Sequence, residues 1–162
     1  MRLFVVRHAK AGDRKRWKGA PDEVRPLSNS GRAQSAALAE RLIEEKPTRL
    51  VSSPILRCVQ TLEPLGEQAG LAVEVDERLM EGASFEESLA LVAELPDGAV
   101  ICSHGDVIPD LISALVRRGM ELTTEPDWRK ATIWVLDGPD ERSPDDEPIF
   151  TTAAVEHPPR FD

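Results

Sequence analysis

The amino-acid sequence predicts an α/β fold: a three-layer sandwich with a mostly parallel central sheet and helices on both of its faces. Short apolar runs rich in β-branched residues alternate along the chain with longer segments whose apolar residues recur at helical spacing. This alternation is typical of parallel strands joined by crossover helices. The chain has 162 residues, of which 41% are hydrophobic and 30% charged. That composition is enough for one globular domain with its own core.

The predicted strands are short apolar runs bounded by turn or polar residues. Val, Ile, Leu and Ala dominate them, and runs of this kind are typical of strands buried on both faces of a sheet. We expect five clear strands and a less regular sixth one near the C-terminus. In chain order, they cover residues 3–6, 49–52, 72–75, 99–102, 131–136 and 150–155.

The predicted helices lie between these strands, and turn or cap residues open the first two. The sequence Ser-Asn-Ser-Gly at residues 28–31 opens the first helix, and Pro47 follows its end. Ser53 as the cap and Pro54 in the first turn open the second, which we expect Pro64 to kink. In chain order, the helices cover residues 32–45, 53–69, 85–95 and 107–118.

Composition excludes several classes of protein. No apolar run is long enough for a membrane span, and the N-terminus has no signal-peptide pattern, so we expect a cytoplasmic protein that does not bind membranes. A formal net charge of −9 argues against nucleic-acid binding. Two cysteines and three histidines are too few for a structural zinc site, and we expect no metal and no cofactor. We treat residues 1–162 as one domain, and a monomer is favoured.

Two segments depart from the average charge and composition. Residues 10–25 carry six basic and three acidic side chains, so the segment is locally positive in an acidic protein. It is interpreted as a solvated loop or as the rim of a binding site. From about residue 138 the chain is rich in proline and acidic residues. That composition predicts a loop-rich, partly mobile C-terminal segment.

Reactive side chains follow three of the predicted strands. Arg7 and His8 come after the first strand, Ser52 and Ser53 with nearby Arg57 after the second, and Ser103-His104-Gly105 after the fourth. Ligands of open α/β sheets bind outside the carboxyl ends of the strands. We therefore expect these side chains to meet in one site.

Two arginines and two histidines suit phosphoryl transfer. Arginine binds phosphate oxygens through two parallel hydrogen bonds, and a protonated histidine adds positive charge. A second, neutral imidazole can attack phosphorus and form a covalent phosphohistidine. Phosphoryl transfer depends mainly on positioning and on charge stabilisation. The set therefore predicts a phosphatase that needs no metal.

The ordered motifs resemble those of the histidine phosphatase superfamily, the phosphoglycerate-mutase-like enzymes. They are Val-Arg-His-Ala at 6–9, Arg-Pro-Leu-Ser-Asn-Ser-Gly at 25–31, Ser-Ser-Pro-Ile-Leu-Arg-Cys-Val-Gln-Thr at 52–61 and Ser-His-Gly at 103–105. The resemblance spans about residues 2–137. Length and the Arg-His-Ala start resemble the SixA-type branch of small phosphohistidine phosphatases. The chain, including Val-Ile-Pro-Asp-Leu at 107–111, also resembles the phosphatase-like half of certain bifunctional Nudix proteins.

This resemblance implies a role for each motif residue. His8 would be the nucleophile, Arg7 and Arg57 would hold the phosphoryl oxygens, and His104 would be a second, charged histidine. Glu81 is our candidate for the general acid that protonates the leaving oxygen, with Glu77 and Glu86 as alternatives. The expected substrate-binding residues are Lys10, Arg14, Lys18, Arg25, Ser103 and Gly105. Trp17 is interpreted either as a cover for a base or protein surface, or as an anchor of its loop.

Three functions remain open at this point. The first, and preferred, is hydrolysis of phosphohistidine on a protein partner, because the short chain leaves little room for a segment that would cover the site. The second is hydrolysis of a small phosphate such as a nucleotide or sugar phosphate. The third is a module that binds a phosphorylated ligand without cleaving it. The retained histidines and arginines favour catalysis.

Overall fold

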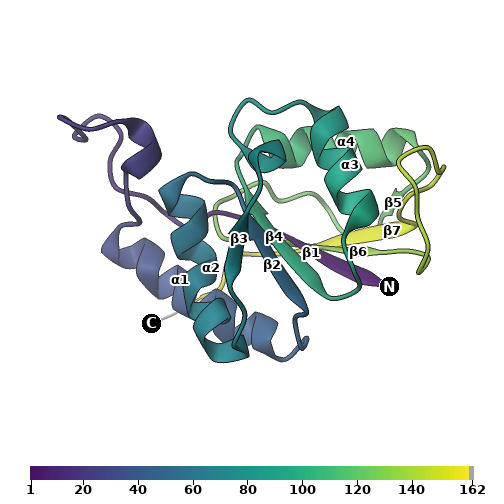
Figure 1. The fold of residues 1–162 in the computed structure, drawn as a ribbon, viewed down its shortest axis with the longest axis horizontal. Helices are drawn as coiled ribbons and strands as arrows, with labels where there is room; N and C mark the ends of the chain where they lie inside the picture. Colours follow the sequence, from purple (N-terminus) through teal and green to yellow (C-terminus); the bar gives the residue numbers. More distant parts are fainter. Residues whose placement is uncertain (161–162) are drawn as a thin grey trace.

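The computed structural model describes residues 1–160 and consists of a seven-stranded sheet between two layers of helices (Figure 1). The strands are β1 (Arg2–Arg7), β2 (Arg49–Ser52), β3 (Val73–Val75), β4 (Ala99–Ser103), β5 (Glu121–Leu122), β6 (Ile133–Asp137) and β7 (Thr152–Glu156). The helices are α1 (Asn29–Ile43), α2 (Leu56–Ala69), α3 (Phe85–Glu94) and α4 (Val107–Arg117), with 3-10 turns η1 (Asp22–Val24) and η2 (Glu77–Leu79). None of these helices is both long and apolar enough to cross a membrane.

The sheet is mostly parallel, and the predicted fold class is confirmed. Its strand order is β3-β2-β4-β1-β6-β7-β5. Strands β3, β2, β4 and β1 run parallel to one another, whereas β6 runs antiparallel to both β1 and β7. Strand β1 is therefore central, with a parallel neighbour on one side and an antiparallel neighbour on the other.

The two helical layers bury alternate residues of the same strands. Helices α1 and α2 cover one face, where Phe4 and Val6 of β1 join the core; α3 and α4 cover the other, where Leu3 and Val5 do so (Figure 1). Because successive side chains of a strand point to opposite faces, one apolar run serves both cores. The continuous run that predicted a buried strand is thus explained by burial on both sides.

The second helix begins later than its sequence predicts. Ser53 was expected to cap it, but α2 starts at Leu56, with Ile55 in extended conformation before it and no side-chain cap. Ser53 instead lies buried at the end of β2, where its hydroxyl contacts His104. A residue typical of a cap is used here as a polar partner inside the site.

The C-terminal segment combines an irregular stretch with a strand. Residues 138–151 form neither helix nor strand, which agrees with the expected loop-rich segment. Ile149 and Phe150 at the end of this stretch are fully buried in the core. Strand β7 pairs with β6 over five residues, so the expected sixth strand is confirmed with a small shift. The short strand β5, which pairs with β7, was not predicted.

Candidate active site

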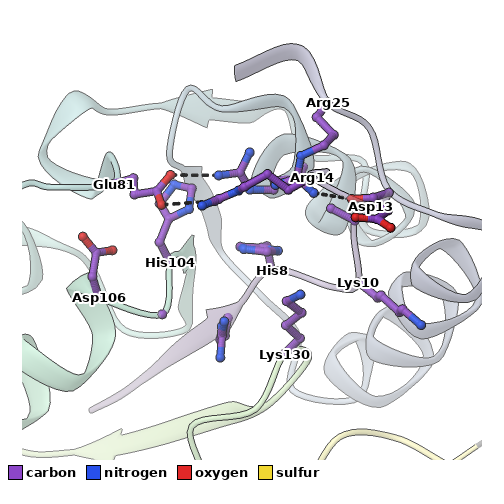
Figure 2. Close-up of a pocket in the computed structure, with 14 residues that line it drawn as sticks. His8, Lys10, Asp13, Arg14, Arg25, Glu81, His104, Asp106 and Lys130 are labelled. Carbon is purple, nitrogen blue, oxygen red and sulfur yellow. Dashed lines mark hydrogen bonds and ion pairs between the residues drawn. The ribbon is translucent and has the colours of Figure 1, made fainter. Parts of the chain in front are cut away.

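The carboxyl ends of β1, β2 and β4 open into one pocket of about 600 Å³ (Figure 2). Four motif residues, Arg7, His8, Arg57 and His104, line it together. His8 lies near the centre of the view, with His104 on one side and the side chain of Lys130 pointing toward it from below. The two imidazole rings are 5.5 Å apart between centroids and meet edge to face.

The His8 ring is held in the tautomer that a nucleophile needs. His8 Nδ1 lies 2.8 Å from the carbonyl oxygen of Ala9. A carbonyl can only accept a hydrogen bond, so Nδ1 carries the proton and Nε2 keeps a lone pair. Burial, together with the positive charges of His104, Arg57 and Arg7, lowers the pKa of His8 to about 3. The imidazole is therefore neutral near neutral pH.

The backbone around His8 is fixed by the first turns of α1 and α2. The amide of Ala9 donates to Thr61 Oγ1, which itself donates to the carbonyl of Arg57. Gly31 lies so close to the carbonyl of Lys10 that a Cβ would overlap it, at 1.8 Å. The glycine of the Ser-Asn-Ser-Gly motif thus permits the close approach of α1 to the segment that follows His8.

The guanidinium of Arg7 occupies a narrow slot beside the loop after β4. Arg7 Nη1 donates to the carbonyl of Trp128. A Cβ on Gly105 would stand 2.7 Å from the guanidinium, which is closer than two such atoms approach. Gly105 therefore lines the pocket as predicted, and the absence of its side chain is what admits Arg7.

Arg57 is the second residue of α2, and its side chain is buried. Its two terminal nitrogens contact carboxylates: Nη2 lies 2.9 Å from Glu81 Oε2 and Nη1 lies 3.2 Å from Asp22 Oδ2. Glu81 also contacts Arg14 at 3.6 Å (Figure 2). An anion that binds Arg57 in this pocket must therefore compete with two carboxylates.

Glu81 is positioned by the first turn of α4. Asp106 caps that helix by accepting from the amide of Val107, and its other carboxylate oxygen accepts from the amide of Gly82 at 2.8 Å. This bond ties the loop that carries Glu81 to the strand end that carries His104. Of the three acid candidates, Glu81 lines the pocket and Glu77 and Glu86 do not.

His104 is almost fully buried, and its ring nitrogens face neighbours from two elements. Nε2 lies 2.8 Å from Ser53 Oγ, and the Cys58 sulfur lies 3.5 Å from the same atom. Ser53 follows β2 and Cys58 belongs to α2. The orientation of this histidine is therefore set by the same segment that presents Arg57.

Most of the predicted substrate-binding residues reach the pocket. Lys10, Arg14, Arg25 and Gly105 line it. Lys18 is exposed on the loop and does not line it, and Ser103 is buried with its hydroxyl donating to the carbonyl of Leu79 at 2.7 Å. Ser103 thus braces the turn before Glu81 instead of facing a substrate.

The sequence interpretation missed three polar side chains of the pocket: Asp13, Asp106 and Lys130. Lys130 is the most informative because it adds a cation. Desolvation lowers its pKa, and so do the charges of Arg7, Arg25, Lys10 and Arg57. Its signal in the sequence was its place just before the predicted strand at 131–136.

Comparison with known proteins agrees with this geometry. Over 158 residues, 90% of this chain, the sequence is 36% identical to the 8-oxo-(d)GTP phosphatase of Mycolicibacterium smegmatis, and covers 49% of that protein. Over 69 residues, 41% of this chain, it is 38% identical to the phosphohistidine phosphatase SixA of Escherichia coli, and covers 40% of it. The chain thus spans half or less of the length of these curated relatives.

The fold matches as well. A solved structure of the protein histidine phosphatase SixA complexed with tungstate superposes with a TM-score of 0.71 at 24% identity, covering 97% of this chain and 95% of that one. The family model described as histidine phosphatase superfamily (branch 1) matches residues 3–87, which is just over half of the chain and includes Arg7, His8 and Arg57. The motifs occur in the order expected for this family, and their side chains meet in one pocket. This chain therefore belongs to the histidine phosphatase superfamily.

Proposed function

We propose that this chain is a phosphatase that transfers a phosphoryl group to His8 and then to water. The observation that carries the proposal is the buried, neutral imidazole of His8, whose Nδ1 is held by the Ala9 carbonyl in a pocket lined by Arg7, Arg57 and His104. A neutral nucleophile among cationic groups suits attack on a phosphate anion, because the arginines offset the developing charge.

The reaction proceeds in two balanced steps. In the first, the lone pair of His8 Nε2 attacks phosphorus, the bond to the leaving group breaks, and the leaving oxygen or nitrogen takes a proton from Glu81. In the second, water attacks phosphorus, the phosphorus–nitrogen bond breaks, and Glu81 takes a proton from the water. Arg7, Arg57 and His104 hold the phosphoryl oxygens throughout.

Two substrate classes have support. Phosphohistidine on a protein partner is favoured by the likeness to SixA of Escherichia coli. The nitrogen of a phosphoramidate also leaves phosphorus more easily than an alkoxide does, so this substrate depends less on a strong general acid. A nucleotide is favoured by the match to an 8-oxo-(d)GTP phosphatase, which extends over 90% of this chain. Both classes use the same pocket and the same nucleophile.

The test is to trap the phosphoenzyme. The protein is mixed with phosphoramidate, quenched in base because phosphohistidine is acid-labile, and mapped by mass spectrometry. We expect phosphate on His8, undiminished by EDTA since arginines replace a metal, and no label in folded His8→Ala. Label on another residue, or full turnover by His8→Ala, would refute the nucleophile. Binding of phosphate without any label would indicate a binding module.

A further inference from the structure

A second cavity opens beside the active site. Its volume is about 330 Å³, and its lining consists of Arg14, Trp17, Ala20, Asp22 and Glu81. Arg14 and Glu81 line the main pocket too, so the two cavities adjoin along these side chains. Trp17 gives this cavity an aromatic wall.

The cavity lies where the leaving group of the substrate would extend. This step rests on the proposed function, in which Glu81 protonates the leaving atom. The leaving group must then extend from phosphorus toward Glu81, whereas Lys130 approaches His8 from another side (Figure 2). The cavity that continues past Glu81 is the space available for the rest of the substrate.

The walls of this cavity have a definite chemistry. Trp17 is half-buried, and its indole Nε1 donates to the carbonyl of Pro21 at 3.0 Å, which fixes the ring. A fixed indole offers a flat surface on which a planar ring can stack. Arg14 is 66% exposed and its contacts to Asp22 and Glu81 are long, at 3.8 and 3.6 Å. Such loose ion pairs exchange partners at little cost.

We propose that this cavity is a leaving-group subsite for the nucleoside of a nucleotide substrate. Trp17 stacks on the base, and Arg14 binds the phosphate that stays with the nucleoside. An aromatic wall beside a guanidinium in loose ion pairs suits a planar base joined to an anion. A phosphohistidine side chain on a folded protein would place a polypeptide there, which matches Arg14 only where an acidic side chain lies next to it.

For a nucleoside diphosphate the chemistry balances as follows. His8 Nε2 bonds to the terminal phosphorus while the bond from that phosphorus to the bridging oxygen breaks. The bridging oxygen departs with the nucleoside monophosphate and takes the proton of Glu81. Water then cleaves the phosphorus–nitrogen bond and yields inorganic phosphate, as in the proposed mechanism. No metal, oxidant or other co-reactant is required by this balance.

The test compares two phosphoryl donors, GDP and phosphoramidate, in three variants. Phosphoramidate releases only ammonia, so its leaving group does not occupy the subsite. We expect Trp17→Ala to lower kcat/KM for GDP about tenfold, mainly through KM, since stacking of a base on an aromatic ring is worth about that factor. Turnover of phosphoramidate should stay within about twofold. Lys15→Ala, an exposed neighbour that lines neither cavity, is the control.

Trp17→Phe separates stacking from anchoring of the loop. It keeps an aromatic ring but loses the bond to Pro21, so retention of most GDP activity supports stacking. Equal losses for both donors in Trp17→Ala and Trp17→Phe would show an anchor only and overturn the subsite. Labelling of His8 by phosphoramidate without any hydrolysis of GDP would also overturn it, while leaving the proposed function intact. Absence of label from both donors would overturn both proposals.

Discussion

At the scale of single residues, Glu81 contacts two arginines at once, one through each carboxylate oxygen. In the structure it contacts Arg57 and Arg14, which are also candidates for binding substrate phosphates. When a phosphate binds to Arg57, it displaces this contact and leaves Glu81 beside the leaving group. A carboxylate next to an incoming anion gains a proton more readily, since like charges disfavour its ionised form. In the proposed mechanism, Glu81 would contact Arg57 before a phosphate binds and act as the acid afterwards.

Glu81→Gln tests this role. Glutamine keeps the size and can still contact Arg57 through its carbonyl oxygen, but it cannot donate an acidic proton. We expect kcat for a phosphate ester with a poor leaving group to fall about a hundredfold, within the range usual for loss of a general acid. Hydrolysis of phosphoramidate should fall much less. Equal losses for the two donors, measured in steady state, would remove Glu81 as the acid.

At the scale of elements, strand direction decides which chain ends meet at the pocket. Strands β1 and β4 are parallel, so the residues that follow them lie together. Strand β6 is antiparallel to β1, with Val6 opposite Ile133. The residues that precede β6 therefore reach the same edge, which is how Lys130 arrives beside Arg7 and His8. A rule that considers only residues after parallel strands misses this lysine.

Lys130→Ala is expected to weaken catalysis without changing the fold, because the side chain is exposed and bound to no carboxylate among residues 1–160. Loss of one cation beside the phosphate should lower kcat/KM about fivefold to tenfold, within the range for a hydrogen bond to a charged group. Lys130→Arg, which keeps the charge, should recover most of that activity. Steady-state kinetics that show no change in Lys130→Ala would exclude a role in substrate binding.

At the scale of the whole molecule, burial of the central strand sets the chemistry of His8. Both helical layers cover β1, and His8 follows it directly, so the ring loses most of its water. The chain has a net charge of −9, yet this edge gathers six basic side chains besides its two histidines: Arg7, Lys10, Arg14, Arg25, Arg57 and Lys130. A concave cationic site in an acidic protein attracts anions locally.

The depressed pKa of His8 predicts how stability depends on pH. In the unfolded chain this imidazole gains a proton near its ordinary pKa of 6.5, whereas in the folded protein it stays neutral down to about pH 3. Between these values the unfolded state binds more protons, so the free energy of unfolding falls as the pH falls. From pH 7 to pH 5 the loss from His8 alone is about 2 kcal/mol.

Urea denaturation at pH 7, 6 and 5 measures this dependence. His8→Gln removes the titrating group and should show a shallower loss of stability with acid, by about that amount. His104 and His157 are present in both proteins, so the comparison isolates the loss of His8 together with its interaction with His104. If the free energy of unfolding fell equally with pH in wild type and variant, His8 would not be held neutral by the fold.

Much of the fold followed from local pattern. The sequence placed three elements within one residue of their observed bounds: the strand over 49–52 and the helices near 85–95 and 107–118. The spacing of apolar residues and a terminal glycine or proline define such elements from the local sequence alone. Ser53 was misjudged for the opposite reason. Whether a serine caps a helix or contacts a histidine depends on what packs beside it.

The sequence by itself determined the fold class, the order of the motifs and the candidate set of Arg7, His8, Arg57 and His104. Residue type and distance along the chain suffice for these, since strand ends in an α/β sheet converge by topology. Only the tertiary structure decided that Ser103 faces Leu79, that Lys18 stays outside the pocket, that Lys130 lines it and that Trp17 lines the second cavity. Those outcomes depend on contacts between segments far apart in sequence, where packing and charge select one arrangement among several that local preference allows.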